Sequence, residues 1–355
     1  MKRTLINLAV VGTILGAGMA QAGGFDRSGQ DTSIILKEGS LLEITSVSVN
    51  PNVTGTYTGA ASSGEVSPNF SFTTFGFRTN VSENMSIAII QDTPFGGDVD
   101  WTAGTYVGTK AKVESSATTL LASYDLDNVT IYGGLKNQSL SASASVPLAA
   151  VYTITSTADS SLGYVLGAAI EKPEIAMRVA LTYHSKINHE VAIVENHAYT
   201  TATSSTLSTT TPESVNLDFQ TGIAENTLLF GTVRQVKWTQ MELIPAVYKA
   251  SPIGKDLKTF SSDVTTYSLG LGRKFTDQWS GAVTYGTEAA EGVVGGPLGP
   301  TDGYNKMGLG VTYTGEQATV TLGVQKINNG DISIAGIEMA NNTTLVTAVK
   351  FSYKF

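Results

Sequence analysis

A two-residue alternation of apolar with polar or small side chains returns along most of this chain, and it constrains the fold more than any other feature. The C-terminal segment shows it clearly, since apolar and polar residues take alternate positions from Val349 to Phe355. Successive side chains of a β-strand point to opposite faces of a sheet, so the pattern predicts strands with one apolar and one polar face. The aromatic face ending on Phe355 also resembles the C-terminal signal of bacterial outer-membrane proteins. An ordinary strand of a soluble sandwich is the alternative.

Composition excludes several other classes of protein. The chain has no cysteine, which rules out disulfides, cysteine metal ligands and a cysteine nucleophile. Its 22 basic and 30 acidic residues give a formal net charge of −8, which argues against a nucleic-acid partner. Charged residues make up 15% of the chain, below the roughly 25% of soluble domains, and a hydrophobic content of 41% argues against a disordered chain.

The first residues predict a secretory signal peptide. Lys2 and Arg3 precede an apolar run from Leu5 to Ala20, and Ala20-Gln21-Ala22 fits a cleavage site. We therefore assign residues 1–22 to the signal peptide, with an uncleaved membrane anchor as the alternative. No apolar run of about 18 residues follows, so the sequence predicts no transmembrane helix after the signal peptide.

The alternating segments are joined by connections of two kinds. Short turns such as Ser82-Glu83-Asn84 alternate with long polar segments such as 188–212 and 239–261, which is typical of a bacterial barrel with short periplasmic turns and long outer loops. The sequence thus predicts an all-β fold, a closed antiparallel transmembrane β-barrel of about 14 strands over residues 41–355, because lipid demands that every backbone polar group be paired. The expected strands lie near 41–49, 67–79, 85–92, 112–125, 129–141, 160–171, 175–187, 213–224, 227–238, 262–275, 278–288, 305–314, 317–327 and 343–355.

Signals for chemistry are few. His184 and His189 have no nearby pair of carboxylates of the kind that binds a metal, and no Gly-x-Ser-x-Gly nucleophile sequence is present. The sequence therefore predicts no enzyme, no metal site and no cofactor. The Ser/Thr-rich run from Ala198 to Thr211 is low in complexity and is expected to form a solvated outer loop, with a binding loop as the alternative.

One expected strand is interrupted. Thr93, Pro94, Phe95, Gly96 and Gly97 follow the segment 85–92, and proline removes a ladder donor while glycine weakens pairing. A barrel strand broken at this point would leave a local gap in the wall. The alternative is that Pro94 only begins an outer loop.

The residues together resemble the FadL/TodX family of outer-membrane transporters for long-chain fatty acids and other hydrophobic compounds. The similarity runs in the family's order through most of the chain after residue 22. The matching stretches are Val49 to Gly55, Asp92 to Trp101, Arg178 to Ser185, Thr211 to Val215, Val236 to Gln240, Tyr267 to Gly286 and Val320 to Asn328.

The resemblance implies a 14-stranded barrel closed by an N-terminal hatch. It also implies a monomer in the bacterial outer membrane and a hydrophobic small-molecule ligand that leaves through a kink in the third strand into the membrane lipid. On this chain the kink corresponds to Thr93–Gly97. The hatch corresponds to the short segment 23–40, with Phe25, Ile34, Ile35 and Leu36 as its plug residues and a free periplasmic tail as the alternative. Family members carry a longer hatch containing Asn-Pro-Ala, and here Asn50-Pro51 lies after the first strand instead.

A ligand with a carboxylate head needs one cation along its path, and an acyl chain gains roughly 0.8 kcal/mol for each buried methylene. Arg178, Lys186 and Lys350 are the candidates that alternation places on the inner face. The resulting hypothesis is a transporter for long-chain fatty acids or other hydrophobic compounds. A general porin for small polar solutes is the alternative, although a porin lumen is ringed by charges and this sequence places mainly small residues inward.

Overall fold

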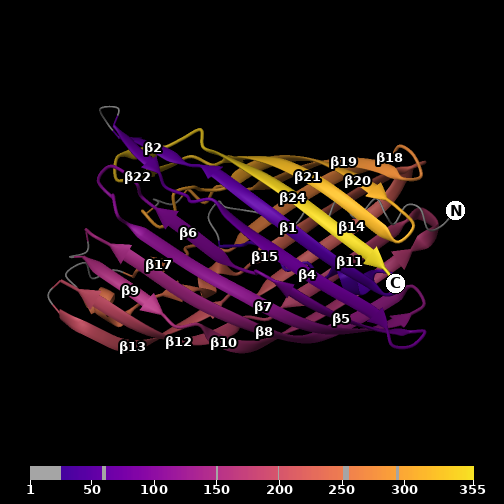
Figure 1. The fold of residues 1–355 in the computed structure, drawn as a ribbon, viewed down its shortest axis with the longest axis horizontal. Coiled ribbons are helices and arrows are strands. Elements are labelled where there is room, and N and C mark those ends of the chain that lie inside the picture. The colour runs from indigo at the N-terminus through magenta and orange to yellow at the C-terminus, as the bar shows by residue number, and fades with distance from the viewer. Residues whose placement is uncertain (1–24, 58–60, 149–150, 199, 251–255, 293–295) are drawn as a thin grey trace.

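The computed structural model describes residues 25–355 except 58–60, 149–150, 199, 251–255 and 293–295. The predicted signal peptide, residues 1–22, lies outside the described residues. Within the described part, no helix has both the length and the apolar character needed to cross a membrane. The chain forms one closed antiparallel barrel (Figure 1).

The predicted barrel of 14 strands is confirmed. The ring closes where β1 pairs with β24, in an unbroken register from Leu41↔Lys354 to Asn52↔Thr343. Around the ring the strands are β1 (Leu41–Asn52), β4 (Phe70–Asn80), β5 (Met85–Asp92), β7 (Lys110–Leu126), β8 (Val129–Val146), β10 (Asp159–Lys172), β11 (Met177–His184), β14 (Ser214–Ala224), β15 (Thr227–Val236), β18 (Val264–Lys274), β19 (Trp279–Glu288), β20 (Tyr304–Thr314), β21 (Ala318–Asn329) and β24 (Thr343–Lys354).

The distribution of side chains is inverted relative to a soluble protein. Apolar side chains are exposed on the outside of the barrel wall, and many polar ones are buried inside it. This arrangement suits a wall surrounded by lipid. Examples on the outer face are Leu120, Tyr124, Leu135, Leu162, Leu166, Leu181, Leu269, Tyr285, Leu309 and Val349.

Four further segments lengthen the wall at its outer end. They are β6 (Gly96–Asp100), β9 (Tyr152–Ser156), β12 (Ile187–His197) and β13 (Thr200–Thr211). The prediction that 188–212 is a loop is therefore wrong, because β12 and β13 pair from Ile187↔Thr211 outward as a hairpin. Threonine is β-branched and favours strands, so a run rich in Ser and Thr extends the sheet here.

The other outer connections carry structure of their own. A four-stranded sheet joins β2 (Thr54–Tyr57), β3 (Ser62–Glu65), β22 (Ile332–Ile334) and β23 (Ile337–Met339). The connection after β15 contains η4 (Trp238–Gln240), β16 (Glu242–Leu243), α2 (Ala246–Ala250) and β17 (Lys258–Thr259). These elements lie at the end of the barrel opposite the C-terminus (Figure 1). A single turn, η3 (Pro173–Ile175), joins β10 to β11 at the other end.

The N-terminal segment lies inside the barrel, so the alternative of a free periplasmic tail is wrong. Its single turn η2 (Ser33–Leu36) presents Ile34 and Ile35, which are 5% and 1% exposed, to an inner cluster on β1, β5, β7 and β8. Leu36 packs against the same cluster. The segment from residue 25 to residue 40 is therefore buried inside the barrel, which is consistent with the predicted plug.

Polar contacts hold the segment upstream of η2. Asp26 accepts hydrogen bonds from Arg234 Nε at 2.5 Å and from Arg234 Nη2 at 3.2 Å, and both side chains are almost completely buried. Ser28 donates to Asp92 over 2.6 Å, and Asn216 donates to the Gly29 carbonyl over 2.9 Å. These bonds fix the segment to opposite sides of the wall.

Candidate functional site

The third strand of the barrel is kinked where the sequence predicts the interruption. Asp92 at the end of β5 pairs with Ala117, and Gly96 at the start of β6 pairs with Glu114. Between these two pairs the third strand has three residues, 93–95, whereas β7 has two, 115 and 116. The extra residue in the third strand makes a β-bulge. Ser115 bridges the bulge by accepting from Phe95 N at 2.9 Å and donating to Phe95 O at 2.6 Å.

On its other side the kinked strand leaves β4 and opens a window in the wall. Pairing between β4 and β5 runs from Asn80↔Ser86 to Phe75↔Gln91 and then ends. Farther out, the two edges meet again where Asp100 N donates to Val66 O over 3.0 Å. Among the described residues, 70–74 of β4 therefore have a ladder partner on β1 but none on the third strand.

The N-terminal segment fills this window from the inside. Asp26 and Phe95 form an antiparallel bridge, Arg27 N donates to Pro94 O, and Gly96 N donates to the carbonyl of Phe25. A Cβ atom added at Gly97 would lie 2.0 Å from the Phe25 ring, so this close approach requires glycine.

Arg27 crosses the window to the far edge. Its guanidinium carbon lies 3.6 Å from the centre of the Phe70 ring on β4, a cation–π contact. The same segment that follows the kinked strand thus also contacts the opposite edge. The gap in the wall is closed by side chains of the plug rather than by strand pairing.

An apolar pocket lies directly behind the window. It has a volume of about 30 Å³, and it shares Phe25, Gly97, Leu257 and Lys258 with a vestibule of about 660 Å³ at the outer end. The apolar pocket is lined by Phe25, Gly97, Val99, Ala111, Val113, Ala142, Ser143, Ala144, Ile154, Leu207, Leu243, Leu257, Lys258 and Leu298.

Four aromatic rings connect the plug, the kink and the outer loop beside this pocket. Phe25 contacts Trp238 and Phe260 with ring centroids 6.2 and 5.5 Å apart, and Phe95 contacts Trp238 at 5.5 Å. Trp238 and Phe260 are 5.1 Å apart. A movement of the plug at Phe25 must therefore disturb both the kink and the loop.

Lys258 is the cation at this pocket, and the sequence did not identify it. Its Nζ lies 4.9 Å from the centre of the Phe260 ring, and among the described residues no carboxylate is within 4.0 Å of it. Burial lowers the pKa of Lys258, an effect that Glu291 partly offsets. A desolvated ammonium group beside an apolar pocket favours an anionic ligand group.

The three cations that the sequence suggested lie elsewhere. Arg178 Nη1 is 3.6 Å from Glu171, and Lys350 Nζ is 3.1 Å from Glu43, so both already have acidic partners near the inner end of the barrel. Lys186 is exposed on the outer face, and the prediction that it faces the lumen is wrong. The alternation shifts by one residue at Ser185, between β11 and β12, where both Ser185 and Ile187 are buried.

Two of the three histidines, His184 and His189, form polar contacts with side chains of other strands. His184 Nδ1 lies 3.1 Å from Lys136 Nζ, and His189 Nδ1 lies 2.8 Å from Asp159 Oδ2. In the described ranges, no group of three His, Asp or Glu side chains is placed to hold a metal ion.

Comparison with known proteins bears on the fold. No protein-family model matches the sequence, and no curated protein matches it either. A FadL homologue from Pseudomonas aeruginosa superposes with a TM-score of 0.73 at 13% identity, covering 97% of this chain and 98% of that one. The chain has the FadL/TodX fold.

Two further solved structures agree with this assignment. The toluene transporter TodX of P. putida has a TM-score of 0.68 at 10% identity, with 96% of this chain and 98% of that chain covered. The toluene transporter TbuX of Ralstonia pickettii has a TM-score of 0.63 at 11% identity, with the same coverage. The FadL/TodX fold therefore extends over nearly the whole chain, in agreement with the resemblance seen in the sequence.

Proposed function

We propose that this protein is a monomeric channel of the bacterial outer membrane through which hydrophobic compounds diffuse. The window beside Thr93–Gly97, with an apolar pocket behind it, is the observation that carries the proposal. A pore for polar solutes has no use for an opening toward lipid, whereas an apolar molecule lowers its free energy by entering the bilayer through it. Solved structures with this fold include a toluene transporter, TodX, and a monoaromatic hydrocarbon channel, CymD.

In the proposed path, the ligand enters the outer vestibule, moves into the apolar pocket and leaves through the window. Phe25 and Arg27 stand between the pocket and the window, so this part of the plug must move for the ligand to pass. Insertion of the ligand beside Phe25 would break the ring contacts with Trp238 and Phe260. No energy source is required, because transfer from water to lipid is itself favourable.

A long-chain fatty acid is the proposed substrate, and Lys258 is the proposed partner of its carboxylate. Lys258→Gln is expected to weaken oleate binding roughly tenfold or more, since a hydrogen bond to a charged group contributes about 1.5–3 kcal/mol. Binding of methyl oleate, which carries no charge, should stay unchanged. Equilibrium binding of both ligands to the purified protein in detergent measures the difference.

The matched control for this change is Lys249→Gln, in the same loop. Lys249 is half exposed and pairs with Asp256 rather than lining the apolar pocket. Lys249→Gln should leave the affinities for oleate and for methyl oleate unchanged. Equal losses of oleate and methyl oleate in Lys258→Gln would contradict a carboxylate role and leave a hydrocarbon as the better substrate.

Uptake of oleate by cells tests the path itself. Changing Pro94→Val together with Gly96→Thr restores an N–H and two β-branched side chains to the third strand. A Cβ at residue 96 would meet Arg27 Nε at 3.1 Å and Val113 O at 3.2 Å, so the substituted strand crowds the window. We expect saturable uptake in the parent and a loss of about tenfold or more in the variant.

Two controls accompany the uptake test. Pro147→Val, in an outer turn after β8, should have no effect on uptake. Heat-modifiable migration of both variants on a gel shows whether the barrel is folded. Uptake equal to that of the parent would contradict release at the kink, and an ion conductance without uptake, in a planar bilayer, would favour the general porin.

A further inference from the structure

The loop between β15 and β18 folds back on itself as a hairpin, and Leu243, Leu257 and Lys258 of this hairpin line the apolar pocket. We call this hairpin the strap and define it as the described residues 238–250 and 256–260. Its two sides pair where Leu243 faces Lys258 and Glu242 faces Thr259. The pairing places Lys258 opposite Leu243, so both line the pocket, and the helix α2 lies at the tip.

One buried carboxylate on the wall holds the tip of the strap. Glu195 of β12 is 0% exposed, and its Oε1 accepts from the backbone N–H groups of Val247 and Tyr248, each at 3.1 Å. Oε1 also accepts from the Tyr152 hydroxyl at 2.8 Å, and Oε2 accepts from the Ser205 hydroxyl at 3.2 Å. Hydrogen bonds to an ionised acceptor are about twice as strong as neutral ones, so the tip is fixed at this point.

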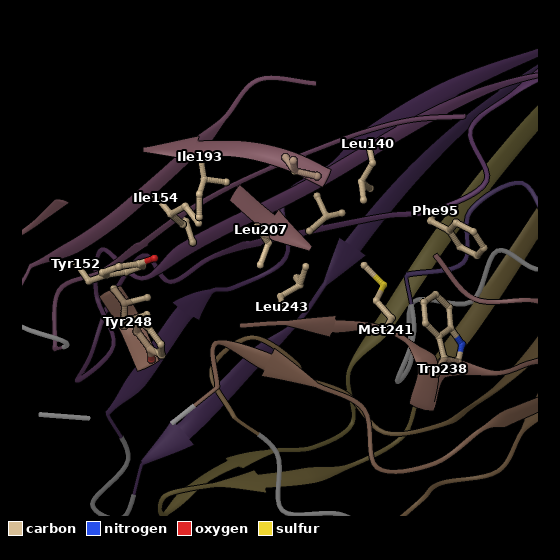
Figure 2. Close-up of a cluster of buried hydrophobic side chains, with 14 of the residues drawn as sticks. Phe95, Leu140, Tyr152, Ile154, Ile193, Leu207, Trp238, Met241, Leu243 and Tyr248 are labelled. Carbon is tan, nitrogen blue, oxygen red and sulfur yellow. The ribbon is translucent and has the colours of Figure 1, made fainter. Parts of the chain in front are cut away.

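Apolar contacts continue the attachment along the strap (Figure 2). Tyr248 packs on Tyr152 at the tip, with ring centroids 4.8 Å apart, and Leu243 lies under Leu207 in the middle. Trp238 packs beside Phe95 at the base. Glu195 is thus the polar end of a continuous contact that runs to the kink.

We propose that Glu195 is a positioning residue for the ligand pocket, which fixes the strap so that Lys258 and Phe260 stand at the pocket's mouth. This inference rests on the proposed function. Between Glu195 and Lys258 the connection is mechanical, through α2 and the pairing of β16 with β17. Glu195 itself does not line the pocket.

The substitution Glu195→Gln tests this proposal while nearly preserving volume. The amide keeps one acceptor but loses the charge, and it presents an NH₂ group to backbone N–H donors. We expect oleate binding to weaken about tenfold in Glu195→Gln. Methyl oleate binding should weaken much less, because it loses only apolar contacts with Leu243 and Leu257, whereas oleate also loses its contact with Lys258. In the Lys258→Gln background the same change should have almost no further effect on oleate, since effects of coupled residues do not add.

The control is Glu190→Gln on the same strand. Glu190 is exposed on the outer face, and its carboxylate accepts from the Ser208 hydroxyl at 2.9 Å. Glu190→Gln should leave the binding of oleate and of methyl oleate unchanged. Equal losses of both ligands in Glu195→Gln, or additive losses in the double variant, would overturn the positioning role and reduce Glu195 to a residue that stabilises the fold.

A measurement without ligand separates this inference from the proposed function. Trypsin cleavage after Lys249, followed by mass spectrometry of the detergent-solubilised protein, reports how often the tip leaves the wall. We expect cleavage at least about tenfold faster in Glu195→Gln than in the parent and in Glu190→Gln. Faster cleavage in Glu195→Gln, with no oleate binding by the parent, would support attachment of the strap by Glu195 and contradict a fatty-acid substrate. Unchanged cleavage would contradict the attachment itself.

Discussion

A disulfide between residues 26 and 95 is expected to stop uptake of hydrophobic ligands, and its reduction is expected to restore it. Asp26 and Phe95 are bridge partners in a non-hydrogen-bonded antiparallel pair, flanked by the bonds Arg27 N to Pro94 O and Gly96 N to Phe25 O. The Cα atoms of such pairs are about 4.5 Å apart, within the range that a disulfide spans. Because the chain has no cysteine, the two introduced thiols can pair only with each other within the molecule.

The expected effect is large because the bond holds the plug inside the window. If Phe25 and Arg27 must leave for the ligand to pass, the oxidised Asp26→Cys/Phe95→Cys variant should take up oleate at least about tenfold more slowly than the reduced form. Fluorescent fatty-acid uptake with and without dithiothreitol measures this ratio in one sample.

Single substitutions provide the controls for the disulfide. Asp26→Cys alone removes the partner of Arg234, and Phe95→Cys alone removes a ring from the aromatic cluster, so each has its own effect on the plug. Neither effect should depend on dithiothreitol. Uptake that persists in the fully oxidised double variant would show that the ligand passes without moving this segment.

The barrel itself could be predicted from the local sequence pattern, because successive side chains of each strand face lipid and lumen in turn. Apolar residues therefore recur at every second position. The segment 85–92 was expected and found as β5 with the same bounds, and 227–238 became β15 over Thr227–Val236. The prediction of which side chains face the lumen failed where the alternation shifts by one residue. At Ser185 an extra residue moves Ile187 inward and Lys186 outward, which no local feature of the sequence marks.

The candidate site could be predicted only in part, because its parts meet through contacts distant in sequence. Proline and glycine predicted the kink at Thr93–Gly97, and the resemblance to the FadL/TodX family suggested that a ligand leaves the barrel there. Lys258 reaches the pocket through the pairing of β17 with β16 and the attachment of α2 to Glu195. Those partners are distant along the chain, and no local spacing encodes their encounter.

Loss of Arg234 is expected to be the most destabilising single change in the lumen. Its guanidinium bonds Asp26, Ser214, Asn216 and Gln30, and the side chain is 2% exposed. Arg234→Met keeps much of the apolar volume but leaves the Asp26 carboxylate buried without its cation. Breaking a buried pair in this way costs about 3–5 kcal/mol.

We expect this loss to displace the N-terminal segment from the barrel interior, because the ion pair holds that segment. The barrel itself should stay folded, because backbone hydrogen bonds between its strands hold it together. We therefore expect Arg234→Met to expose the N-terminal segment to protease and to raise ion conductance in planar bilayers, with heat-modifiable folding preserved. Replacing the carboxylate as well, in Asp26→Asn/Arg234→Met, should recover part of the closed state because no unpaired charge remains buried.

Arg273→Met is the matched control, because Arg273 is exposed on β18 and donates to the Thr227 hydroxyl at 2.9 Å. It should leave conductance and protease resistance at the parent level. If Arg234→Met conducts no better than Arg273→Met and its N-terminus stays protected, the plug is held by η2 and its apolar cluster alone. In that case the ion pair of Asp26 with Arg234 contributes nothing to closure, and the displacement that opens the window must begin at Phe25 and its aromatic neighbours.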